Sequence, residues 1–572
     1  MKKIKEIKKL ILQHNLDGYL VPKNDEFFGE YVSEEKDNLK YISNFTGSFG
    51  LAIILKKKNY LFVDGRYTLQ AKIQSSKNFK IITFPQELPK NIFKKKILNI
   101  GFDPKIHTQK MLDYFFFNSK CNLVPVNFNL IDKIKNKKKI IKPKPFFILK
   151  NKDSGSNYQN KIIKLAKILK RKKVDIQFIS APENIAWLLN LRGNDSKFSP
   201  LPNAYFFIDK EKNCFLFCDL RKINKNIKIT LKNIRFIDIN FTYIFFLKIK
   251  NKKIIVDKNT CSIFFKNILK KNNQIIEEPD IINNLKSIKN KIEIKNTIKS
   301  HIYDGAALTK FLFWLKNNFK RKKISEISAQ NKLFSFRKKI KTFRSLSFPT
   351  ISGSGPNGAI IHYKATKKSN RNLQKGDLYL IDSGAQYNFG TTDVTRTISL
   401  ENKNSYIKDI FTRVLKGHIA VANYKLNKRT YGSQIDFVAR KALKKINLDY
   451  PHGTGHGVGY FLNVHEGPHG ISRGNKIKLQ EGMIVSNEPG YYKKGEFGIR
   501  IENLVTVIKK KNKYKFKDLT LAPIEKSLIK KELLNKKEID WLNNYHNRVY
   551  LNLKKYMNTM ELKQLKDSCS NI

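Results

Sequence analysis

Acidic residues stand inside apolar, strand-like runs in the C-terminal half of the chain. In DLYLIDSGAQYNFGTTDVTRTISL (residues 377–400), two such runs flank the turn signal YNFG (387–390), and they carry Asp382 and Asp393. A hairpin centred on this turn sets residue 382 opposite residue 395, so Asp393 lies diagonally across on the same face. Burying two anions there without a cation is very unfavourable, so the pair predicts a metal ion or a shared proton. Two solvent-facing acids are the alternative, although the flanking runs look buried.

A glycine-rich segment holds four of the ten histidines of the chain. In PHGTGHGVGYFLNVHEGPHG (residues 451–470) these are His452, His456, His465 and His469. The glycines around His456 leave the backbone free of Cβ atoms, so another group can approach closely, which suits a metal-binding imidazole. For His452 and His469 an ordinary core or surface role is an equally good interpretation.

A third segment again combines two strand-like runs with buried acids. GMIVSNEPGYYKKGEFGIRIENLVTV (residues 482–507) turns at Lys and Gly residues and carries Glu488 and Glu502 among apolar neighbours. Their even separation does not by itself place both on one face of a hairpin. The prediction therefore needs an irregularity at Pro489-Gly490, which the glycine allows.

The charges of these acids predict two cations. Four carboxylates supply four negative charges, which two divalent ions balance, and His456 remains as a neutral ligand. Such a set favours hard or borderline ions, namely Mn²⁺, Co²⁺ or Zn²⁺. Two metals about 3.5–4 Å apart can deprotonate a water and polarise a carbonyl, so hydrolysis is the predicted chemistry.

The N-terminal half shows one pattern twice. Asp64-Gly65-Arg66 and Asp219-Leu220-Arg221 each follow two strand-like runs joined by a charged tip. We infer a duplicated α/β domain. The segment KIKNKKKIIKPKP (residues 133–145) is expected to link the copies, because its prolines and like charges disfavour both helix and core.

The composition describes a folded and strongly basic chain of 572 residues. Hydrophobic residues make up 41% and aromatic residues 12%, which is enough for packed cores. The 112 Lys and Arg against 47 Asp and Glu give a net charge of +65. Because lysines occur throughout the chain, we interpret them as a solvated coat and do not expect nucleic acid as a partner, although basic patches attract polyanions.

The remaining composition bears on location. The five cysteines are scattered without a CxxC pair, which favours reduced thiols over disulfides or a thiolate zinc site. No apolar run approaches the roughly 18 residues needed to cross a bilayer. Polar residues interrupt the basic N-terminus before it could act as an export signal. We therefore expect a cytoplasmic protein that does not bind membranes.

Motifs along nearly the whole chain resemble one enzyme family. LIDSGAQY, TTDVTRTI, HGTGHGVGYFLNVHEGPHGIS, NEPGYY and GIRIENL look like the dinuclear metallopeptidases of the "pita-bread" fold, and FPTISGSGPNGAIIHY resembles the approach to their active site. YISNFTGSFG, DGRYTLQA and APENIAWLLNLRGND resemble creatinase-like N-terminal domains. LTLAPIEKSLI and EIDWLNNYHNRVYLNL resemble a short C-terminal extension. The sequence is thus similar to the long, three-domain form of the Xaa-Pro aminopeptidases (aminopeptidase P).

The resemblance implies an α/β (α+β) fold in four parts. Two creatinase-like N-terminal domains are expected at residues 1–138 and 145–288. A pita-bread catalytic domain follows at 289–510, and the C-terminal extension occupies 511–572.

The resemblance also implies a ligand set. Asp382, Asp393, His456, Glu488 and Glu502 match the ligands of two divalent cations per subunit, preferably Mn²⁺, with Co²⁺ or Zn²⁺ as alternatives. Asp393 and Glu502 would bridge both ions, His456 and Glu488 would complete one, and Asp382 the other.

Further roles come from the same resemblance. His362 and His465 would face the substrate near the scissile carbonyl and stabilise the tetrahedral intermediate, as fixed donors beside an oxyanion do. Glu488 would shuttle a proton from the attacking hydroxide to the departing proline nitrogen. Tyr492 and Arg500 would support the carboxylates that bind metal.

The implied reaction is hydrolysis of the N-terminal Xaa-Pro bond of peptides by a hydroxide that bridges two metals. The preference for proline in the second position rests on the resemblance alone, as does the expected homodimer. One position departs from the family, because Asn38 stands where relatives often carry an arginine, and that substrate contact is in question.

Two alternatives stay open. A prolidase-like dipeptidase has the same fold, although the C-terminal segment favours the aminopeptidase. A non-catalytic pita-bread binding module is the second alternative, although all five ligand positions keep competent side chains.

Overall fold

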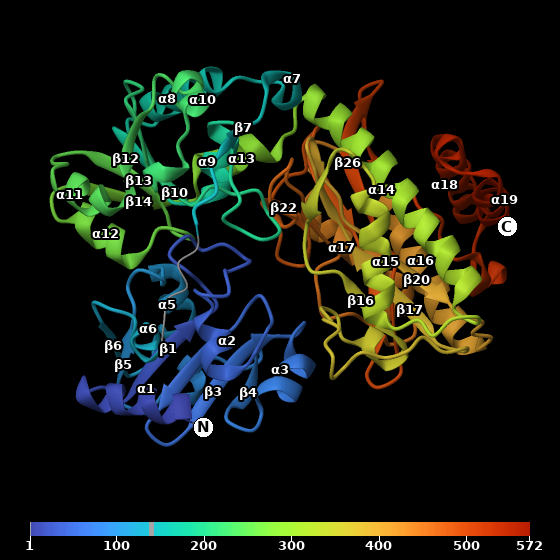
Figure 1. Ribbon diagram of the computed structural model, residues 1–572, viewed down its shortest axis with the longest axis horizontal. Helices are drawn as coiled ribbons and strands as arrows, with labels where there is room; N and C mark the ends of the chain where they lie inside the picture. Colours follow the sequence, from blue (N-terminus) through green and yellow to red (C-terminus); the bar gives the residue numbers. More distant parts are fainter. Residues whose placement is uncertain (1, 136–141) are drawn as a thin grey trace. The chain divides into compact units, whose positions relative to one another are not determined.

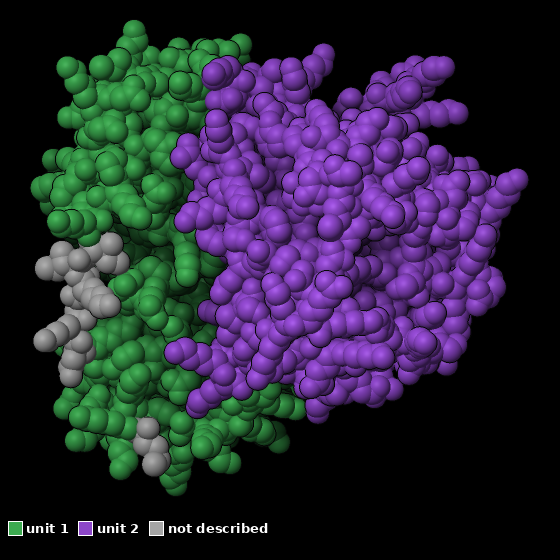
Figure 2. All heavy atoms as spheres, turned by 45° about the vertical axis from the view of Figure 1, so that its right-hand side comes forward, with its two compact units in different colours: residues 1–151, 156–283 green, residues 152–155, 284–572 purple. Residues whose placement is uncertain are grey.

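The structure is a computed structural model, and it describes residues 2–135 and 142–572 (Figure 1). The chain forms two compact units (Figure 2). Unit 1 comprises Met1–Asn151 and Ser156–Asn283, and unit 2 comprises Lys152–Gly155 and Asn284–Ile572. Residues 136–141, the middle of the predicted linker, lie outside the described residues. Among the helices of the described residues, none combines the length and the apolarity needed to cross a bilayer.

Unit 1 contains two six-stranded sheets with the same topology, as the predicted duplication requires. The first has the order β4-β3-β2-β1-β5-β6 and the second β12-β11-β10-β8-β13-β14. In each sheet the central hairpin strands pair antiparallel and the outer strands pair parallel. The first sheet contains β1 (Gly18–Pro22), β2 (Leu51–Leu55), β3 (Asn59–Asp64), β4 (Lys80–Phe84), β5 (Leu98–Phe102) and β6 (Cys121–Pro125). The second contains β8 (Ile176–Ile179), β10 (Ala204–Asp209), β11 (Cys214–Cys218), β12 (Arg235–Asp238), β13 (Lys253–Asp257) and β14 (Gln274–Glu278).

Amphipathic helices cover these sheets. Hydrophobic residues on both faces of each sheet are buried in clusters that belong mainly to one copy, and Phe27 and Ile263 each join a cluster of the other copy. The helices of the first copy include α1 (Lys2–Gln13), α2 (Asn38–Ser43), α3 (Thr68–Ser75), α5 (Gln109–Phe116) and α6 (Leu130–Ile134). Those of the second include α8 (Tyr158–Arg171), α9 (Pro182–Leu188), α11 (Thr242–Leu247) and α12 (Ile263–Lys270). Cys214 and Cys218 are buried in one cluster, and all five cysteines are free thiols.

Unit 2 is a set of antiparallel sheets framed by long helices. One sheet has the order β16-β17-β20, another β15-β18-β19, and a third β22-β21-β23-β26-β27, beside the pair β24-β25. The strands of the first two sheets are β15 (Phe343–Leu346), β16 (Ile351–Ser354), β17 (Leu378–Ser383), β18 (Ala385–Tyr387), β19 (Gly390–Thr391) and β20 (Val394–Ser399). The others are β21 (Gly455–Gly457), β22 (Glu466–Ile471), β23 (Ile484–Asn487), β24 (Gly490–Lys493), β25 (Phe497–Arg500), β26 (Asn503–Lys510) and β27 (Lys513–Asp518).

The long helices of unit 2 mostly begin at side-chain caps. Asn290 and Glu293 form a capping box at the start of the longest helix, in which each side chain bonds the backbone of the other. These helices are α14 (Lys291–Asn318), α15 (Glu326–Lys338), α16 (Ser405–Ala422), α17 (Gly432–Lys444), α18 (Lys536–Leu553) and α19 (Thr559–Cys569). Residues of α16, α18 and β25 share one hydrophobic cluster, so the C-terminal helices belong to the core of unit 2. The β26–β27 hairpin also runs across residue 511, where the sequence places the start of the extension.

Candidate metal centre

The hairpin of β17 and β20 places two of the predicted acids. Asp382 pairs with Thr395, which confirms the register predicted from the sequence, and Asp393 directly precedes β20. Asp382 is 7% exposed and Asp393 is 4% exposed. The alternative of two solvent-facing acids is therefore wrong, because the apolar runs around them bury both carboxylates.

Glu488 and Glu502 lie where two strand pairs meet. Asn487 pairs with Asn503 in one ladder, and Gly490 pairs with Arg500 in the next. The residues between these ladders belong to neither, so the chain has the irregularity that the sequence required, beginning one residue earlier than predicted. Because strict alternation stops here, both glutamates can turn to the same side.

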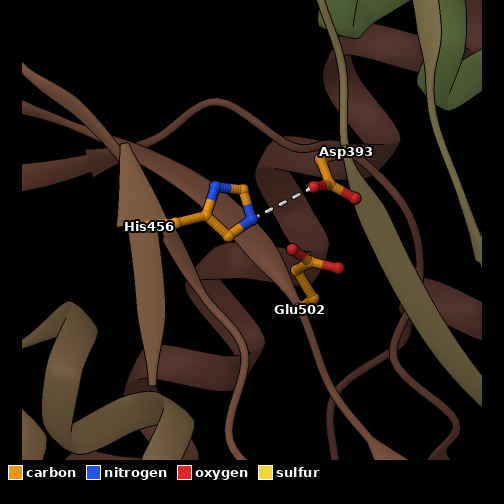
Figure 3. Close-up of side chains that lie close together, drawn as sticks. All are labelled: Asp393, His456 and Glu502. Atoms are coloured by element: carbon orange, nitrogen blue, oxygen red, sulfur yellow. Dashed lines mark ion pairs between the residues drawn. The ribbon is translucent and has the colours of Figure 1, made fainter. Parts of the chain in front are cut away.

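A cluster of potential ligands forms where these segments meet β21. One oxygen each from Asp393 and Glu502 and one ring nitrogen of His456 all lie within 4.8 Å of one another. Figure 3 shows the three side chains converging from different segments. The Nε2 atom of His456 lies 3.4 Å from Oδ2 of Asp393 and 3.5 Å from Oε1 of Glu488. Four of the five predicted ligands are thus brought together.

The fifth residue, Asp382, provides a test of whether a cation fits. Its Oδ2 atom accepts a hydrogen bond from Nη2 of Arg500 at 2.6 Å. Its Oδ1 atom is buried and has no hydrogen-bond partner among the described residues. A buried carboxylate oxygen without a donor is unfavourable, and a divalent cation would satisfy it. The donor set of oxygens and one imidazole fits such an ion.

The ionisation of the cluster agrees with this fit. Burial, together with the charges of Asp382 and Glu488, raises the pKa of Asp393 to about 6, although the bond to His456 opposes the shift. Burial, together with the charges of Asp393, Glu488 and Asp382, raises the pKa of Glu502 well above its usual value. Burial lowers the pKa of His456, but the bond to Asp393 and the charge of Glu488 raise it to about 9. A cation between acids that lie this close together reduces the repulsion between their charges and lowers their pKa values.

Arg500 links several groups around the carboxylates. It donates from Nη2 to Asp382, from Nη1 to the hydroxyl of Tyr492 at 2.6 Å, and from Nε to Oγ1 of Thr395 at 3.1 Å. Tyr492 in turn contacts Nε2 of His452 at 2.9 Å. The structure thus places Tyr492 and Arg500 beside the predicted ligand Asp382.

Two hydroxyl side chains at the site were not predicted from the sequence. Thr395 donates from Oγ1 to Oε2 of Glu502 at 2.8 Å. Ser486 donates from Oγ to Oε1 of Glu488 at 2.9 Å and accepts the backbone N–H of His456 at 2.9 Å. A signal was available, because each hydroxyl stands two residues from an acid, Thr395 after Asp393 and Ser486 before Glu488.

The histidines fall into different classes. The ring of His465 is half-buried and meets that of His456 edge to face, with centroids 4.4 Å apart. His469 is buried, and its Nε2 atom contacts the carbonyl of Ile484 at 2.9 Å, as a core histidine does. His362 is half-buried and lies just after the short helix η3 (Gly355–Ala359).

The segment that carries His362 is close to β25. A Cβ atom at Gly498 would come within 1.8 Å of the carbonyl oxygen of Gly358 in η3. Only glycine permits this approach of η3 to the strand that ends at Arg500. His362 therefore belongs to a segment that packs on an element of the site.

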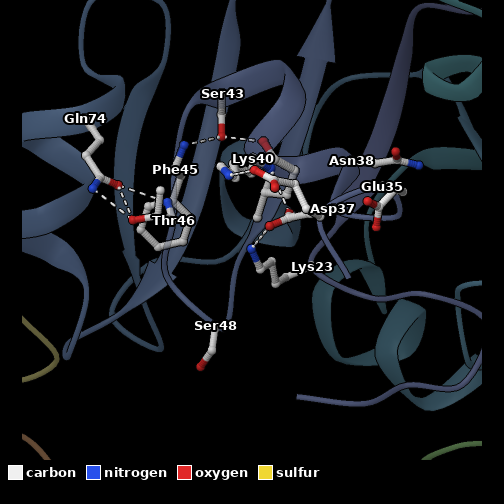
Figure 4. Close-up of polar contacts among 12 residues, drawn as sticks. Lys23, Glu35, Asp37, Asn38, Lys40, Ser43, Phe45, Thr46, Ser48 and Gln74 are labelled. Atoms are coloured by element: carbon white, nitrogen blue, oxygen red, sulfur yellow. Dashed lines mark hydrogen bonds and ion pairs between the residues drawn. The ribbon is translucent and has the colours of Figure 1, made fainter. Parts of the chain in front are cut away.

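Asn38 lies in unit 1, at the start of α2 (Figure 4). Asp37 before it caps the helix by accepting the N–H of Lys40 and pairs with Lys23. The side-chain oxygen of Asn38 accepts a hydrogen bond from Nζ of Lys135. The position thus holds a neutral side chain bound to a lysine of α6's C-terminal end.

Family models match the chain from end to end. The creatinase/prolidase N-terminal domain matches residues 3–132 and, in a second model, 136–293. Metallopeptidase family M24 matches residues 295–509, and the C-terminal region of peptidase M24 matches 512–572.

Individual relatives of the chain belong to the same family as the models that match it. A probable Xaa-Pro aminopeptidase P of Laccaria bicolor is 36% identical, over 99% of this chain and 93% of the relative. The crystal structure of X-prolyl aminopeptidase from Caenorhabditis elegans, described as a cytosolic enzyme with a di-nuclear active site, is 31% identical with a TM-score of 0.95. It covers 100% of this chain and 99% of that one.

A prolidase matches less of the chain. That of Thermococcus sibiricus is 26% identical with a TM-score of 0.52, and it covers 65% of this chain and 98% of its own. The full-length matches favour the aminopeptidase over the dipeptidase alternative. With two creatinase-like domains, a cluster of side chains that could hold a metal ion and a matching C-terminal region, the chain belongs to the Xaa-Pro aminopeptidases of metallopeptidase family M24.

Proposed function

We propose that this enzyme removes the first residue of peptides that have proline in the second position, at a centre of two divalent cations. The observation that carries this proposal is the convergence of Asp393, His456 and Glu502, with a buried oxygen of Asp382 left without a donor among the described residues. The full-length similarity to Xaa-Pro aminopeptidases supports the substrate class.

The ligand roles follow from the predicted set. Asp393 and Glu502 would bridge both cations, His456 and Glu488 would complete one, and Asp382 the other. When bound, such cations act as Lewis acids on a carbonyl and make an attacking water acidic at neutral pH. Arg500 neutralises part of the charge of Asp382 and holds its Oδ2 atom in a hydrogen bond. The Oδ1 atom of Asp382 would then bind the cation.

Glu488 is suited to move a proton. It is less buried than Asp393 or Glu502, and its Oε1 atom is oriented by the hydroxyl of Ser486 at 2.9 Å. The nitrogen of the scissile amide must receive a proton as it departs, and after an Xaa-Pro bond it leaves as the secondary amine of a proline residue. A carboxylate beside the reacting bond can take that proton from the attacking water and deliver it to the nitrogen.

The histidines supply donors to the substrate. His465 is partly exposed beside His456, so its ring can reach a carbonyl oxygen that develops negative charge. We propose the same role for His362, namely donation of a hydrogen bond to the substrate near the scissile carbonyl. Neither residue is assigned as a metal ligand.

Three finer features complete the proposal. We propose Mn²⁺ as the ion, because carboxylate-rich sites with one imidazole accept it readily. We propose a cytoplasmic location, which the cytosolic relative supports. We also propose a homodimer and the domain boundaries 138, 145, 289 and 511, which light scattering against the chain mass of 66.7 kDa and limited proteolysis would test.

The central experiment combines metal analysis with two substrates. Protein purified without added ions is analysed for metal, and the same preparation is assayed on an Xaa-Pro-Xaa tripeptide and an Xaa-Pro dipeptide. The proposal predicts up to two Mn²⁺ ions per chain and much faster release of the first residue from the tripeptide. Faster cleavage of the dipeptide would establish the prolidase alternative. Metal-loaded protein that cleaves neither substrate would establish the non-catalytic one.

A further inference from the structure

A buried arginine holds together the two segments that carry the proposed bridging acids. Arg396 lies on β20, three residues after Asp393, and it is 1% exposed. Its Nη1 atom donates to the carbonyl of Thr395 at 2.8 Å and to that of Glu502 at 2.7 Å. Because Thr395 also bonds the Glu502 carboxylate through its side chain, Arg396 fixes the backbone on both sides of that contact.

The other edge of the same guanidinium faces the C-terminal region. Its Nη2 atom donates to Oδ1 of Asn503 at 2.9 Å, to the carbonyl of Ala522 at 2.8 Å and to the hydroxyl of Tyr545 at 2.8 Å. Its Nε atom donates to the carbonyl of Pro523 at 3.0 Å. The planar fork of an arginine is rigid, so a shift of these acceptors moves the opposite edge as well.

The acceptor Tyr545 is itself firmly placed on α18. Its ring is buried and stacks on Trp541, with centroids 5.4 Å apart and an interplanar angle of 8°. Its hydroxyl donates to the carbonyl of Ala522 at 2.9 Å. The next residue, His546, accepts the backbone N–H of Ile524 at 3.1 Å. The segment after β27 is therefore held by α18 at two consecutive positions.

A second connection runs in parallel. Arg548 of α18 donates to Oδ2 of Asp518 at 3.0 Å, and Oδ1 of Asp518 accepts Nδ2 of Asn503 at 3.2 Å. Asn503 directly follows Glu502 in the chain. The first connection thus ends on the backbone carbonyl of Glu502, and the second ends on the side chain of the next residue.

We propose that the C-terminal helix α18 positions the metal-bridging carboxylate Glu502 through Tyr545 and Arg396, which makes both of them positioning residues for catalysis. The inference rests on the proposed function, in which Glu502 binds both cations. Partners outside the ligand sphere orient the ligands, and their loss weakens metal binding or activity by about 10- to 100-fold. Tyr545 lies one step further out than Arg396, so its effect belongs at the lower end of this range.

Tyr545→Phe tests the proposal because it keeps the ring and its stack on Trp541 and removes the hydroxyl alone. We expect the Kd for Mn²⁺, measured by titration calorimetry on metal-free protein, to rise about tenfold. At limiting Mn²⁺ the kcat for an Xaa-Pro-Xaa peptide should fall, with KM unchanged, and excess Mn²⁺ should restore it. Tyr550→Phe is the matched control, since it removes a hydroxyl from the same helix and should leave both quantities unchanged.

Arg396→Lys keeps the charge and loses the fork, so it should weaken Mn²⁺ binding more than Tyr545→Phe does. A Tyr545→Phe protein that melts at a lower temperature but binds Mn²⁺ with the affinity of the wild type would overturn the proposal and leave Tyr545 a purely structural role. Weaker binding in Tyr545→Phe but not in Arg396→Lys would overturn the route through Arg396. Wild-type protein that binds no Mn²⁺ would instead refute the proposed function.

Discussion

Two groups of buried acids in unit 2 are balanced in opposite ways. Glu466 of β22 pairs with Lys289 and lies 3.5 Å from Nζ of Lys286, and all three side chains are at most 3% exposed. Burial alone would raise the pKa of Glu466, but the two lysine charges bring it below its usual value. Asp393 and Glu502 are buried to the same degree, and their pKa values rise because burial raises them and the charges of neighbouring acids add to the effect.

The sign of the neighbouring charges distinguishes acids that stabilise the fold from acids that are proposed to bind a metal ion. An acid that stabilises the structure receives its cation from the chain, as Glu466 does from Lys289 and as Asp304 does from the bidentate Arg337. The acids of the metal centre share one imidazole and one guanidinium among them. In the proposed function ions from solution balance their charge, so mutation should change the stability of the protein in opposite directions at the two groups.

The largest effect is expected for Asp393→Asn. The change removes a bridging ligand, so turnover of an Xaa-Pro-Xaa peptide should be abolished and the Mn²⁺ content should fall. The metal-free protein should be no less stable than the wild type, because one of several crowded charges is gone. Activity, metal analysis and a thermal melt in EDTA measure the three quantities. Near-normal turnover with added Mn²⁺ would contradict the bridging role.

His465→Ala distinguishes a donor to the substrate from a ligand. The ring lies against His456 but is assigned to the substrate, so the variant should keep its Mn²⁺ and lose activity by about 10²- to 10⁴-fold, as removal of a proton-transfer or oxyanion contact does. Metal analysis and kcat together test this. Loss of bound metal would move His465 into the ligand set.

Glu466→Gln should weaken the fold rather than the chemistry of metal binding. It leaves two buried lysines without their acid, which destabilises a protein by about 3–5 kcal/mol. Urea unfolding of the metal-free protein measures the loss. Glu496→Gln is the control, because its ion pair with Lys493 is exposed and screened by solvent, so its loss should change the stability little. An equal loss of unfolding free energy in the two variants would show that the buried ion pair stabilises the protein no more than the exposed one.

Much of the candidate metal centre could be predicted because residues close together in the sequence indicate it. The turn at residues 387–390 fixes the pairing of Asp382 with Thr395, and apolar neighbours mark the acids as buried. The glycines around His456 indicated a close approach, and β21 indeed packs so tightly that a Cβ at Gly455 would meet the carbonyl of Ser486 at 1.9 Å.

The contacts that were not predicted join distant parts of the chain. Lys289 and Glu466 are 177 residues apart, and Arg396 and Tyr545 are 149 apart. In a chain with 112 Lys and Arg, no local pattern singles out the lysine that will be buried. These contacts depend on how helices pack against sheets, which composition and periodicity do not specify.

Asp280 in unit 1 is an intermediate case, and it makes the comparison quantitative. Its carboxylate is buried and accepts hydrogen bonds from Nε2 of Gln177 at 2.5 Å, Nδ2 of Asn184 at 2.7 Å and the N–H of Ile282 at 2.8 Å. These donors are neutral, so they offset the burial only in part, and burial raises its pKa from 3.8 to about 6.

The sign of the resulting pH dependence follows from proton binding. Between pH 3.8 and about 6 the folded chain keeps a proton on Asp280 that the unfolded chain releases. The contribution of Asp280 to stability should therefore fall as pH rises through this window, by on the order of 3 kcal/mol at about 1.36 kcal/mol per pKa unit, and stay level above it.

Asp280→Asn isolates this contribution. The amides of Gln177 and Asn184 each have an oxygen without a hydrogen-bond partner among the described residues, so either can rotate to accept the new N–H₂ group. The variant should fold, and the difference in unfolding free energy between it and the wild type should grow in favour of the variant from pH 4 to pH 7. Urea unfolding at several pH values measures that difference, in which the titration of the other acids cancels. A difference independent of pH would mean that the amides already stabilise the ionised carboxylate fully, and that an acid needs no cation to be buried in this fold.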